Sequence, residues 1–267
     1  MLKDMTLGQF FPGKTVVHRL DPRTKLILVI VYIVALFSAK WLVTYGLMLL
    51  TLCGIVAASK INPKVILRSL KPLLFIIVLT GILNLFYTQG EPLVKIWVLT
   101  ITREGIYSAV FMVLRISMLI AGTFMLTYTT SPISLTDGLE LLLNPLKKIK
   151  VPVHELSMMM CIALRFIPTL IEETDKIMSA QKARGADFET GSLLQRAKAL
   201  IPILVPLFIS SFRRADELAV AMECRCYHGG EGRTRMKQLH YGSIDYVALV
   251  GGAVILAAVI VLARFGL

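Results

Sequence analysis

The stretch LILVIVYIVALFSAKWLVTYGLMLLTLCGIVAA, residues 26–58, is almost continuously apolar, and only Ser38 and Lys40 interrupt it near its middle. As a single α-helix rising 1.5 Å per residue it would be about 50 Å long, whereas the hydrocarbon core of a bilayer is about 30 Å thick. The stretch is therefore too long for one membrane span. We expect a tight helical hairpin that turns at residues 38–40.

Three further apolar runs predict more spans, at residues 72–87, 105–130 and 244–262. The composition agrees, because 56% of the 267 residues are hydrophobic and the mean hydropathy of +0.72 is too high for an ordinary globular surface. We predict an all-α, polytopic membrane protein with about five transmembrane helices. A cytoplasmic N-terminal segment and four of the spans lie within residues 1–130, and the last span lies within residues 243–267.

The formal charge of +12 is compatible with nucleic-acid binding, but the position of the charges favours another interpretation. Lys60, Lys64, Arg68 and Lys71 fill the loop after the second span, whereas the preceding turn carries only Lys40. Loops rich in Lys and Arg stay on the cytoplasmic side of a membrane. We therefore expect a cytoplasmic N-terminus and contact of the basic residues with the lipid bilayer, with no nucleic-acid partner.

Residues 131–242 carry charges of both signs and are expected to form a cytoplasmic domain of long amphipathic coupling helices. Each predicted helix begins apolar and ends charged. One apolar face follows helical spacing through Phe166 and Leu170, and a second does so through Phe208 and Phe212.

A faint internal repeat with an offset of 41 residues lies within this domain. TDKIMSAQKAR, residues 174–184, aligns with ADELAVAMECR, residues 215–225. Both copies end in an arginine between small residues, first Ala183-Arg184-Gly185 and then Cys224-Arg225-Cys226. Small neighbours let another surface approach the backbone, and a guanidinium is suited to bidentate capture of a carboxylate. The alternative is that each arginine merely complements the dipole at the end of its helix.

Three other patterns are candidate sites. GQFFPGKT, residues 8–15, matches the phosphate-binding loop pattern, but it lacks a preceding strand and Pro12 removes a backbone N–H, so we reject it. Cys224, Cys226 and His228 lack the spacing of a metal site, so we expect neither metal nor cofactor. Arg115, inside a span, is either a functional residue or a bundle-facing arginine that pairs with a neighbour.

Several separated motifs together resemble one family, the T component of energy-coupling factor transporters. They are Gly8-Gln9 with Pro12-Gly13, HRLDPRTK at 18–25, LRFIP at 164–168, QKARG at 181–185, AMECRCY at 221–227 and GGEGRTR at 229–235. They occur in order along essentially the whole chain.

The resemblance implies a bacterial cell-membrane scaffold whose crossed coupling helices each dock on one of two ABC-type ATPases. Arg184 falls on the first docking motif and Arg225 on the second, where Cys224 and Cys226 replace the family's Ala and Gly. It also implies a separate membrane partner, the S component, which binds a vitamin or other micronutrient.

On this basis we expect the chain to transmit motion from the ATPases to the S component and to catalyse nothing itself. Asp175 and Asp216 are expected to orient the arginines or to pair across the helix crossing. The residues Phe166, Leu170, Phe208 and Phe212 are expected to hold the crossed helices together or to contact the S component. Two alternatives remain at this point: a self-sufficient ion-coupled transporter, and an integral membrane enzyme built around Arg115 and His154.

Overall fold

The computed structural model describes residues 10–88, 92–96, 99–188, 190, 192–229 and 238–265, with the backbone alone described for 92–96, 99–101 and 193. Gly8, Gln9 and residues 230–235 of the family motifs lie outside this part. The chain divides into two compact units. Leu7–Leu141 and Leu239–Leu267 form what we call the bundle unit, and Leu142–Gln238, together with Met1–Thr6, form the two-helix unit. Our expected boundaries were 131 and 243.

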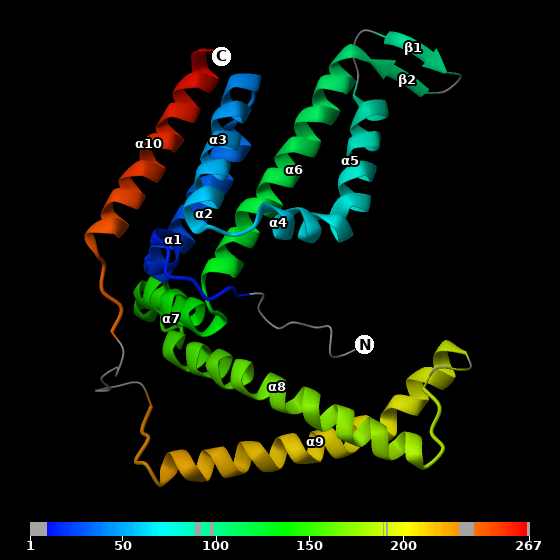
Figure 1. Ribbon diagram of the computed structural model, residues 1–267. Helices are drawn as coiled ribbons and strands as arrows, with labels where there is room; N and C mark the ends of the chain where they lie inside the picture. Colours follow the sequence, from blue (N-terminus) through cyan, green and yellow to red (C-terminus); the bar gives the residue numbers. More distant parts are fainter. Residues whose placement is uncertain are drawn as a thin grey trace. The chain divides into compact units, whose positions relative to one another are not determined.

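Helices dominate the bundle unit (Figure 1). In chain order they are α1 (Val16–Arg19), α2 (Pro22–Ser38), α3 (Leu42–Ser59), α4 (Pro63–Leu70), a 3₁₀ turn (Lys71–Leu73), α5 (Leu74–Tyr87), α6 (Arg103–Thr129), α7 (Pro132–Leu143) and α10 (Ser243–Phe265). Helix α2 packs against α10 and α6, and α5 packs along α6. The all-α class is confirmed, and the predicted helical hairpin is formed by α2 and α3.

One short β-hairpin joins α5 to α6, and we did not predict it. Strand β1 (Pro92–Ile96) pairs antiparallel with β2 (Leu99–Thr102). Helix α6 then begins at Arg103, where the side chain of Thr102 accepts a hydrogen bond from the N–H of Gly105 and so satisfies one free donor of the first turn.

The HRLDPRTK motif ties the first turn of α2 to the rest of the bundle unit. Asp21 caps α2 by accepting a hydrogen bond from the N–H of Arg23, and Pro22 suits the first helical position. The carboxylate of Asp245, in the first turn of α10, accepts the N–H of Asp21 at 2.8 Å. The buried ammonium of Lys25 donates to three oxygens. They are His18 O (3.3 Å), Thr129 O (2.9 Å) and Thr130 Oγ1 (3.1 Å). The starts of α2 and α10 and the end of α6 are thereby held together.

Arg115 of α6 is a bundle-facing arginine that pairs with neighbours. Its Nε donates to the hydroxyl of Tyr45 at 2.8 Å, and its Nη2 donates to the carbonyl of Ala39 at 3.1 Å. The Ala39 carbonyl is one of the carbonyls that the end of α2 leaves without a helical partner. The guanidinium also lies 5.9 Å from the ring centroid of Phe37. Arg115 therefore fastens the turn between α2 and α3, which favours the structural alternative for this residue.

Six described helical segments are long and apolar enough to cross a membrane. They are Leu42–Ser59, Pro63–Tyr87, Arg103–Thr129, Val153–Ala183, Leu194–Glu223 and Ser243–Phe265. Four of them contain predicted spans. Helix α2, with 17 residues, is not among them, although it remains within the range of known spans. The two segments that we expected outside the membrane have the lowest mean hydropathy, 1.3 against 2.0 to 2.7 for the others.

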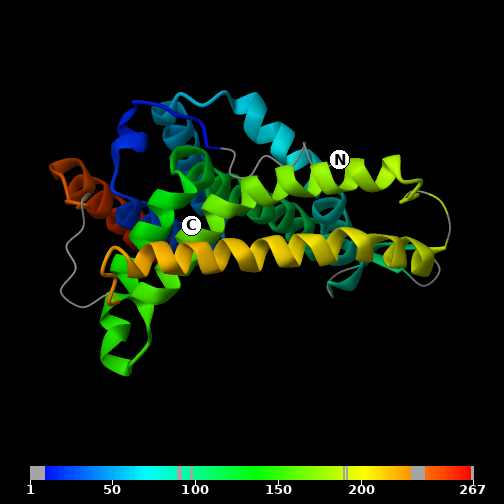
Figure 2. The same cartoon turned by 90° about the horizontal axis from the view of Figure 1, so that it is seen from below.

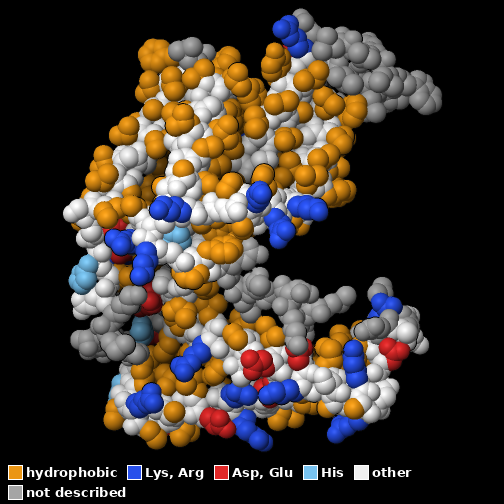
Figure 3. Space-filling model, viewed as in Figure 1, with side chains coloured by type: hydrophobic (Ala, Val, Ile, Leu, Met, Phe, Trp, Pro, Cys, Tyr) orange, Lys and Arg blue, Asp and Glu red, His pale blue; other side chains and the backbone are white. Residues whose placement is uncertain are grey.

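Basic side chains gather along α4, on the side of the bundle unit visible in Figure 3. Lys64, Arg68 and Lys71 are exposed, as is Lys60 at the end of α3. In Figure 1 α4 runs across the direction of α5 and α6. This arrangement suits a helix that lies along the surface of a bilayer while its neighbours cross it.

The two-helix unit contains a 3₁₀ turn (Asn144–Ile149), α8 (Val153–Ala183) and α9 (Leu193–Glu223). Figure 2 shows the two long helices side by side. They run antiparallel, because Gln181 of α8 lies beside Pro202 of α9 and Glu173 lies beside Ser210. The prolines that we expected to kink or delimit these helices, Pro168, Pro202 and Pro206, lie inside them.

Candidate functional site

Helix α8 ends in a hydrogen-bonded turn built around Gly185. The N–H of Ala186 donates to the carbonyl of Gln181 at 3.0 Å, and the N–H of Gly185 donates to the carbonyl of Lys182 at 3.0 Å. Gly185 has φ +87°, a left-handed conformation that glycine adopts without strain. These features make a Schellman motif, which satisfies carbonyls that the helix end leaves free. Arg184 is the residue immediately before the left-handed position.

Helix α9 ends in the same way 41 residues later. The N–H of Tyr227 donates to the carbonyl of Met222 at 3.1 Å, and the N–H of Cys226 donates to the carbonyl of Glu223 at 2.9 Å. Cys226 takes the left-handed position with φ +56°, which costs a side chain with a Cβ about 1–2 kcal/mol. Arg225 therefore stands where Arg184 stands in α8. The sequence left the termination of this helix open, and the structure makes the two ends equivalent.

Both arginines project from these turns into open space. Arg184 and Arg225 are exposed, and neither makes a hydrogen bond or an ion pair within the part of the chain that the structure describes. Ala183 and Gly185 on one end, and Cys224 and Cys226 on the other, are exposed as well. Each end thus presents one guanidinium between small residues.

Asp175 and Asp216, which we expected to orient the arginines or to pair across the crossing, do neither among the described residues. Asp175 is half-buried and Asp216 is exposed, and their carboxylates have no hydrogen-bond or ion-pair partner there.

The ion pair at the crossing is formed instead by Glu173 and Arg214. The carboxylate of Glu173 accepts a hydrogen bond from Arg214 Nη2 at 3.1 Å and another from the hydroxyl of Ser210. The Ser210 hydrogen bond and the charge of Arg214 lower the pKa of Glu173. The side chains of Arg214 and Glu173 are 38% and 21% exposed, so we assign the pair about 1 kcal/mol. We call these three residues the crossing latch.

The crossing latch was not predicted from the sequence, although the repeat contains its signal. Glu173 and Arg214 are separated by 41 residues, the offset of the repeat, and carry opposite charges. Equivalent positions on two antiparallel helices can meet at the point where the helices cross. Opposite charges at equivalent positions are therefore one signal of such a pair, although Glu172 and Arg213 share the pattern and make no ion pair in the described chain.

The antiparallel register places the two arginine ends far apart. Gln181 lies beside Pro202, so the end of α8 lies near residue 199 of α9. Helix α9 continues for roughly 26 more residues to Arg225, which corresponds to about 40 Å at 1.5 Å per residue. Any partners of the two ends therefore contact opposite ends of the helix pair.

Helix α9 faces α8 with a different side from the one that its apolar pattern suggested. Ile203 is only 3% exposed, and Ser210 and Arg214 are half-buried against α8. Phe208 and Phe212 stack with their ring centroids 6.5 Å apart on an exposed face. We call this face the outer stripe. Its members are 47–68% exposed: Ile201, Leu204, Val205, Phe208, Ile209 and Phe212.

The apolar residues of the two helices were expected either to hold the crossed helices together or to contact the S component. Their exposure differs between α8 and α9. Phe166 and Leu170 of α8 are half-buried, whereas the phenylalanines of the outer stripe lie in the open. Phe208 and Phe212 therefore do not pack between the two helices of this unit.

No three His, Cys, Asp or Glu side chains within the described ranges gather as they would around a metal ion. Cys224, Cys226 and the two remaining cysteines are free thiols. Arg115, proposed for the enzyme alternative, already donates to Tyr45 and Ala39.

Comparison with known proteins matches one family over most of the chain. The family model CbiQ, described as cobalt transport protein, matches residues 13–236. The energy-coupling factor transporter transmembrane protein EcfT of Thermosediminibacter oceani is 53% identical over 264 residues, or 99% of each chain. The protein of that name from Acidaminococcus fermentans is 54% identical over 100% of this chain and 99% of its own length. That of Bacillus subtilis is 46% identical over 99% of this chain and its whole length.

The strained left-handed cysteine yields a test of the helix-end geometry. Replacing Cys226 with Gly should raise the free energy of unfolding by about 1 kcal/mol, because glycine adopts positive φ without a Cβ clash. The reciprocal change, Gly185→Cys, should lower it by a similar amount, since no atom within 4 Å of the added Cβ complicates the comparison. Thermal unfolding in detergent measures both. Equal unfolding midpoints for wild type, Cys226→Gly and Gly185→Cys would contradict the left-handed turn at the two helix ends.

The crossing latch is tested by exchanging its charges. Glu173→Arg and Arg214→Glu should each lower the unfolding midpoint, and the double exchange should recover most of the loss, with a coupling energy of about 1 kcal/mol. The matched control is Glu172→Arg with Arg213→Glu, exposed neighbours at the same 41-residue offset that make no ion pair in the described chain. A coupling energy no larger than that of the control would show that the latch contributes nothing.

Proposed function

The chain belongs to the CbiQ family of cobalt transport proteins, and from that premise we propose that it is the coupling subunit of an energy-coupling factor importer. Its relatives are named as the transmembrane protein of such a transporter. We assign this chain the same general role, a multi-pass transmembrane component that is not an enzyme. ATP hydrolysis then belongs to partner proteins.

The observation that carries the coupling role is the pair of equivalent arginine ends. Arg184 and Arg225 occupy the same position in the same hydrogen-bonded turn, and both are exposed and unpaired among the described residues. An arginine that served only the dipole of its helix would not need small neighbours or a repeated left-handed turn. A planar guanidinium on a narrow helix end suits bidentate binding of a carboxylate in a groove.

Two equivalent helix ends are best matched by two equivalent binding sites on partner proteins. We propose that each end docks on one of two ABC-type ATPase subunits in the cytoplasm. The separation of about 40 Å between the ends, from 1.5 Å of rise per residue, lets two globular subunits bind at once without sharing a surface.

ATP binding would draw the ATPase subunits together and move the docked ends relative to each other. The crossing latch lies between the ends and acts as the pivot, because Glu173 joins α8 to both Ser210 and Arg214 of α9. Rigid helices on either side of a pivot convert motion at their ends into motion of their other halves.

The outer stripe is the proposed contact for the membrane-embedded S component. It runs over about 16 Å of helix and is apolar throughout, so it would bury its side chains against a partner helix by ordinary ridge-and-groove packing. The S component would bind the vitamin or other micronutrient, and its identity sets the substrate.

The basic side chains on α4 support a cytoplasmic N-terminus in a bacterial cell membrane. Lys60, Lys64, Arg68 and Lys71 lie at the connection from α3 to α5, and such residues favour the cytoplasmic side. In this orientation the starts of α2 and α10 are cytoplasmic, and the β-hairpin between α5 and α6 is outside.

The docking assignment is tested by a pull-down of the tagged chain from its native membrane in mild detergent. Wild type should bring down two ATPase-sized soluble proteins. The variant Arg184→Glu/Arg225→Glu should lose both, because reversing each anchor removes about 2–5 kcal/mol of binding and adds repulsion. The control is Lys198→Glu/Arg213→Glu, the same charge change at two exposed positions of α9.

Two results would refute the proposal. If wild type comes down alone, the chain works without ATPases and a self-sufficient transporter becomes the better explanation. If the double variant keeps every partner that the control keeps, the arginines are not the anchors.

A further inference from the structure

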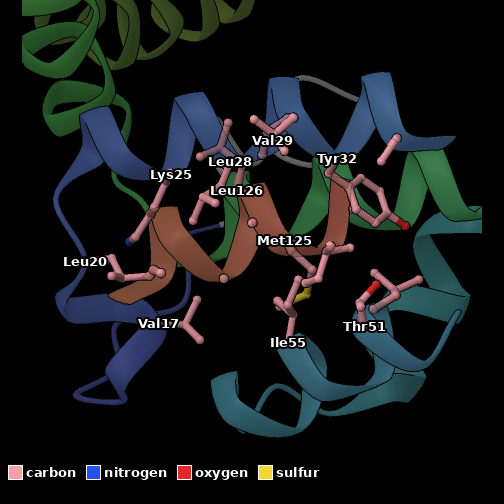
Figure 4. Close-up of a pocket in the computed structure, with 18 of the residues that line it drawn as sticks. Val17, Leu20, Lys25, Leu28, Val29, Tyr32, Thr51, Ile55, Met125 and Leu126 are labelled. Carbon is pink, nitrogen blue, oxygen red and sulfur yellow. The ribbon is translucent and has the colours of Figure 1, made fainter. Parts of the chain in front are cut away.

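The bundle unit contains an elongated cavity of about 310 Å³ between α2, α3, α6 and α10, and a residue of α1 lines one end of it. Figure 4 shows Val17 of α1 and Leu20, which follows α1, beside Lys25 at that end, and Tyr32 and Thr51 toward the other. The wall is almost entirely aliphatic. The docking ends play no part in it, so the role of the cavity is independent of the proposed function.

The cavity offers an occupant no free hydrogen-bond donor and only the remaining acceptor positions of three hydroxyl oxygens. Four polar side chains line it, and each already has an acceptor within the protein. The bonds are Tyr32 Oη to Met118 O (3.2 Å), Thr51 Oγ1 to Met48 O (2.7 Å), Thr129 Oγ1 to Met125 O (2.7 Å), and the three bonds of the Lys25 ammonium described above. A polar vitamin or an ion would lose most of its hydration here and gain few hydrogen bonds in return. The occupant that fits is a hydrocarbon.

The length and volume of the cavity suit a single hydrocarbon chain. The lining extends along α2 from Lys25 to Ala35, which is about 15 Å at 1.5 Å per residue. A cavity of about 310 Å³ with this length suits one narrow, unbranched chain. At ~30 Å³ per group, the share of a water molecule in the liquid, it holds about 10 methylene groups.

Glycines shape the wall from two sides. A Cβ on Gly252 would lie 2.5 Å from a methyl carbon of Leu28, and one on Gly122 would lie 2.4 Å from the ring of Tyr32, so these glycines mark close contacts between helices. Gly251, next to one of them, also lines the cavity, but a Cβ there meets no atom within 4 Å. A side chain at Gly251 would therefore enter the cavity without a clash.

We propose that this cavity binds one acyl chain of a membrane phospholipid as a structural component of the bundle. The cavity runs along α2, parallel to helices that are long enough to cross a bilayer, and this is also the direction of lipid chains. The end at Lys25 lies where the starts of α2 and α10 and the end of α6 meet in polar contacts. The chain would enter with its methyl end toward Ala35.

The test compares three full-length proteins purified in mild detergent: wild type, Gly251→Leu and Gly54→Leu. Gly54 is an exposed glycine of α3 that also has no atom within 4 Å of an added Cβ, and it does not line the cavity, so the two variants share the same chemical change. Native mass spectrometry counts bound lipids, and lipid extraction identifies them. Wild type and Gly54→Leu should retain one phospholipid more than Gly251→Leu does.

A second measurement keeps the test valid if Gly251→Leu fails to fold. Wild type in nanodiscs is exposed to a phospholipid that carries a photoreactive group in its acyl chain, exchanged into detergent, and then illuminated. Labelling should fall on wall residues such as Leu52, Met125 and Leu126. Labelling only on exposed side chains such as Ile30 and Val34, an equal lipid count in all three proteins, or retention of a free fatty acid instead of a phospholipid would each overturn the proposal.

Discussion

At the end of each long helix, two backbone hydrogen bonds and one left-handed residue hold an arginine as the last projecting side chain. The coupling role proposed for this chain depends on that turn. The bonds from Gly185 and Ala186 in one copy, and from Cys226 and Tyr227 in the other, place the two arginines at the same backbone position with respect to their helices. Because the turns are the same, one kind of socket accepts both. Because the helices are antiparallel, the two arginines lie at opposite ends of the helix pair, which suits the two separate partners that we propose.

Motion at the end of a helix is transmitted only if contacts along that helix hold it in place. Glu173 is held from two sides, by Ser210 and Arg214, near the middle of the helix pair. In the bundle unit the corresponding rigidity comes from polar contacts at both ends of α2, with Asp21 and Lys25 at its start and Arg115 at its close. The interior of the bundle between those contacts is apolar and leaves the cavity that we assign to a lipid chain. Stiff ends and a lipid-filled middle suit a scaffold that must keep its shape while partners move.

Particular residues show which features of the structure could be predicted from the sequence and which could not. The helical hairpin at residues 38–40, three further spans and the equivalence of Arg184 and Arg225 followed from apolar run lengths and from the 41-residue repeat, which are local signals. The role of the outer stripe stayed open between two alternatives, because an apolar face predicts burial against something but not whether the partner is the same chain. Phe208 and Phe212 have the pattern of a core and lie exposed. The partners of Arg115 were not predictable, since a tyrosine hydroxyl and a helix-end carbonyl leave no charge pattern.

The most direct test of the coupling role is a distance measurement between the two docking ends in the assembled transporter. Spin labels at Ser179→Cys and Val220→Cys, exposed positions one turn before the arginines and 41 residues apart, are placed in a chain whose native cysteines are replaced. Trapping ATP should shift the distance distribution by several ångströms, and Arg184→Glu/Arg225→Glu should abolish the shift. The same distribution with and without trapped ATP, in a complex that hydrolyses ATP and transports, would contradict the coupling role.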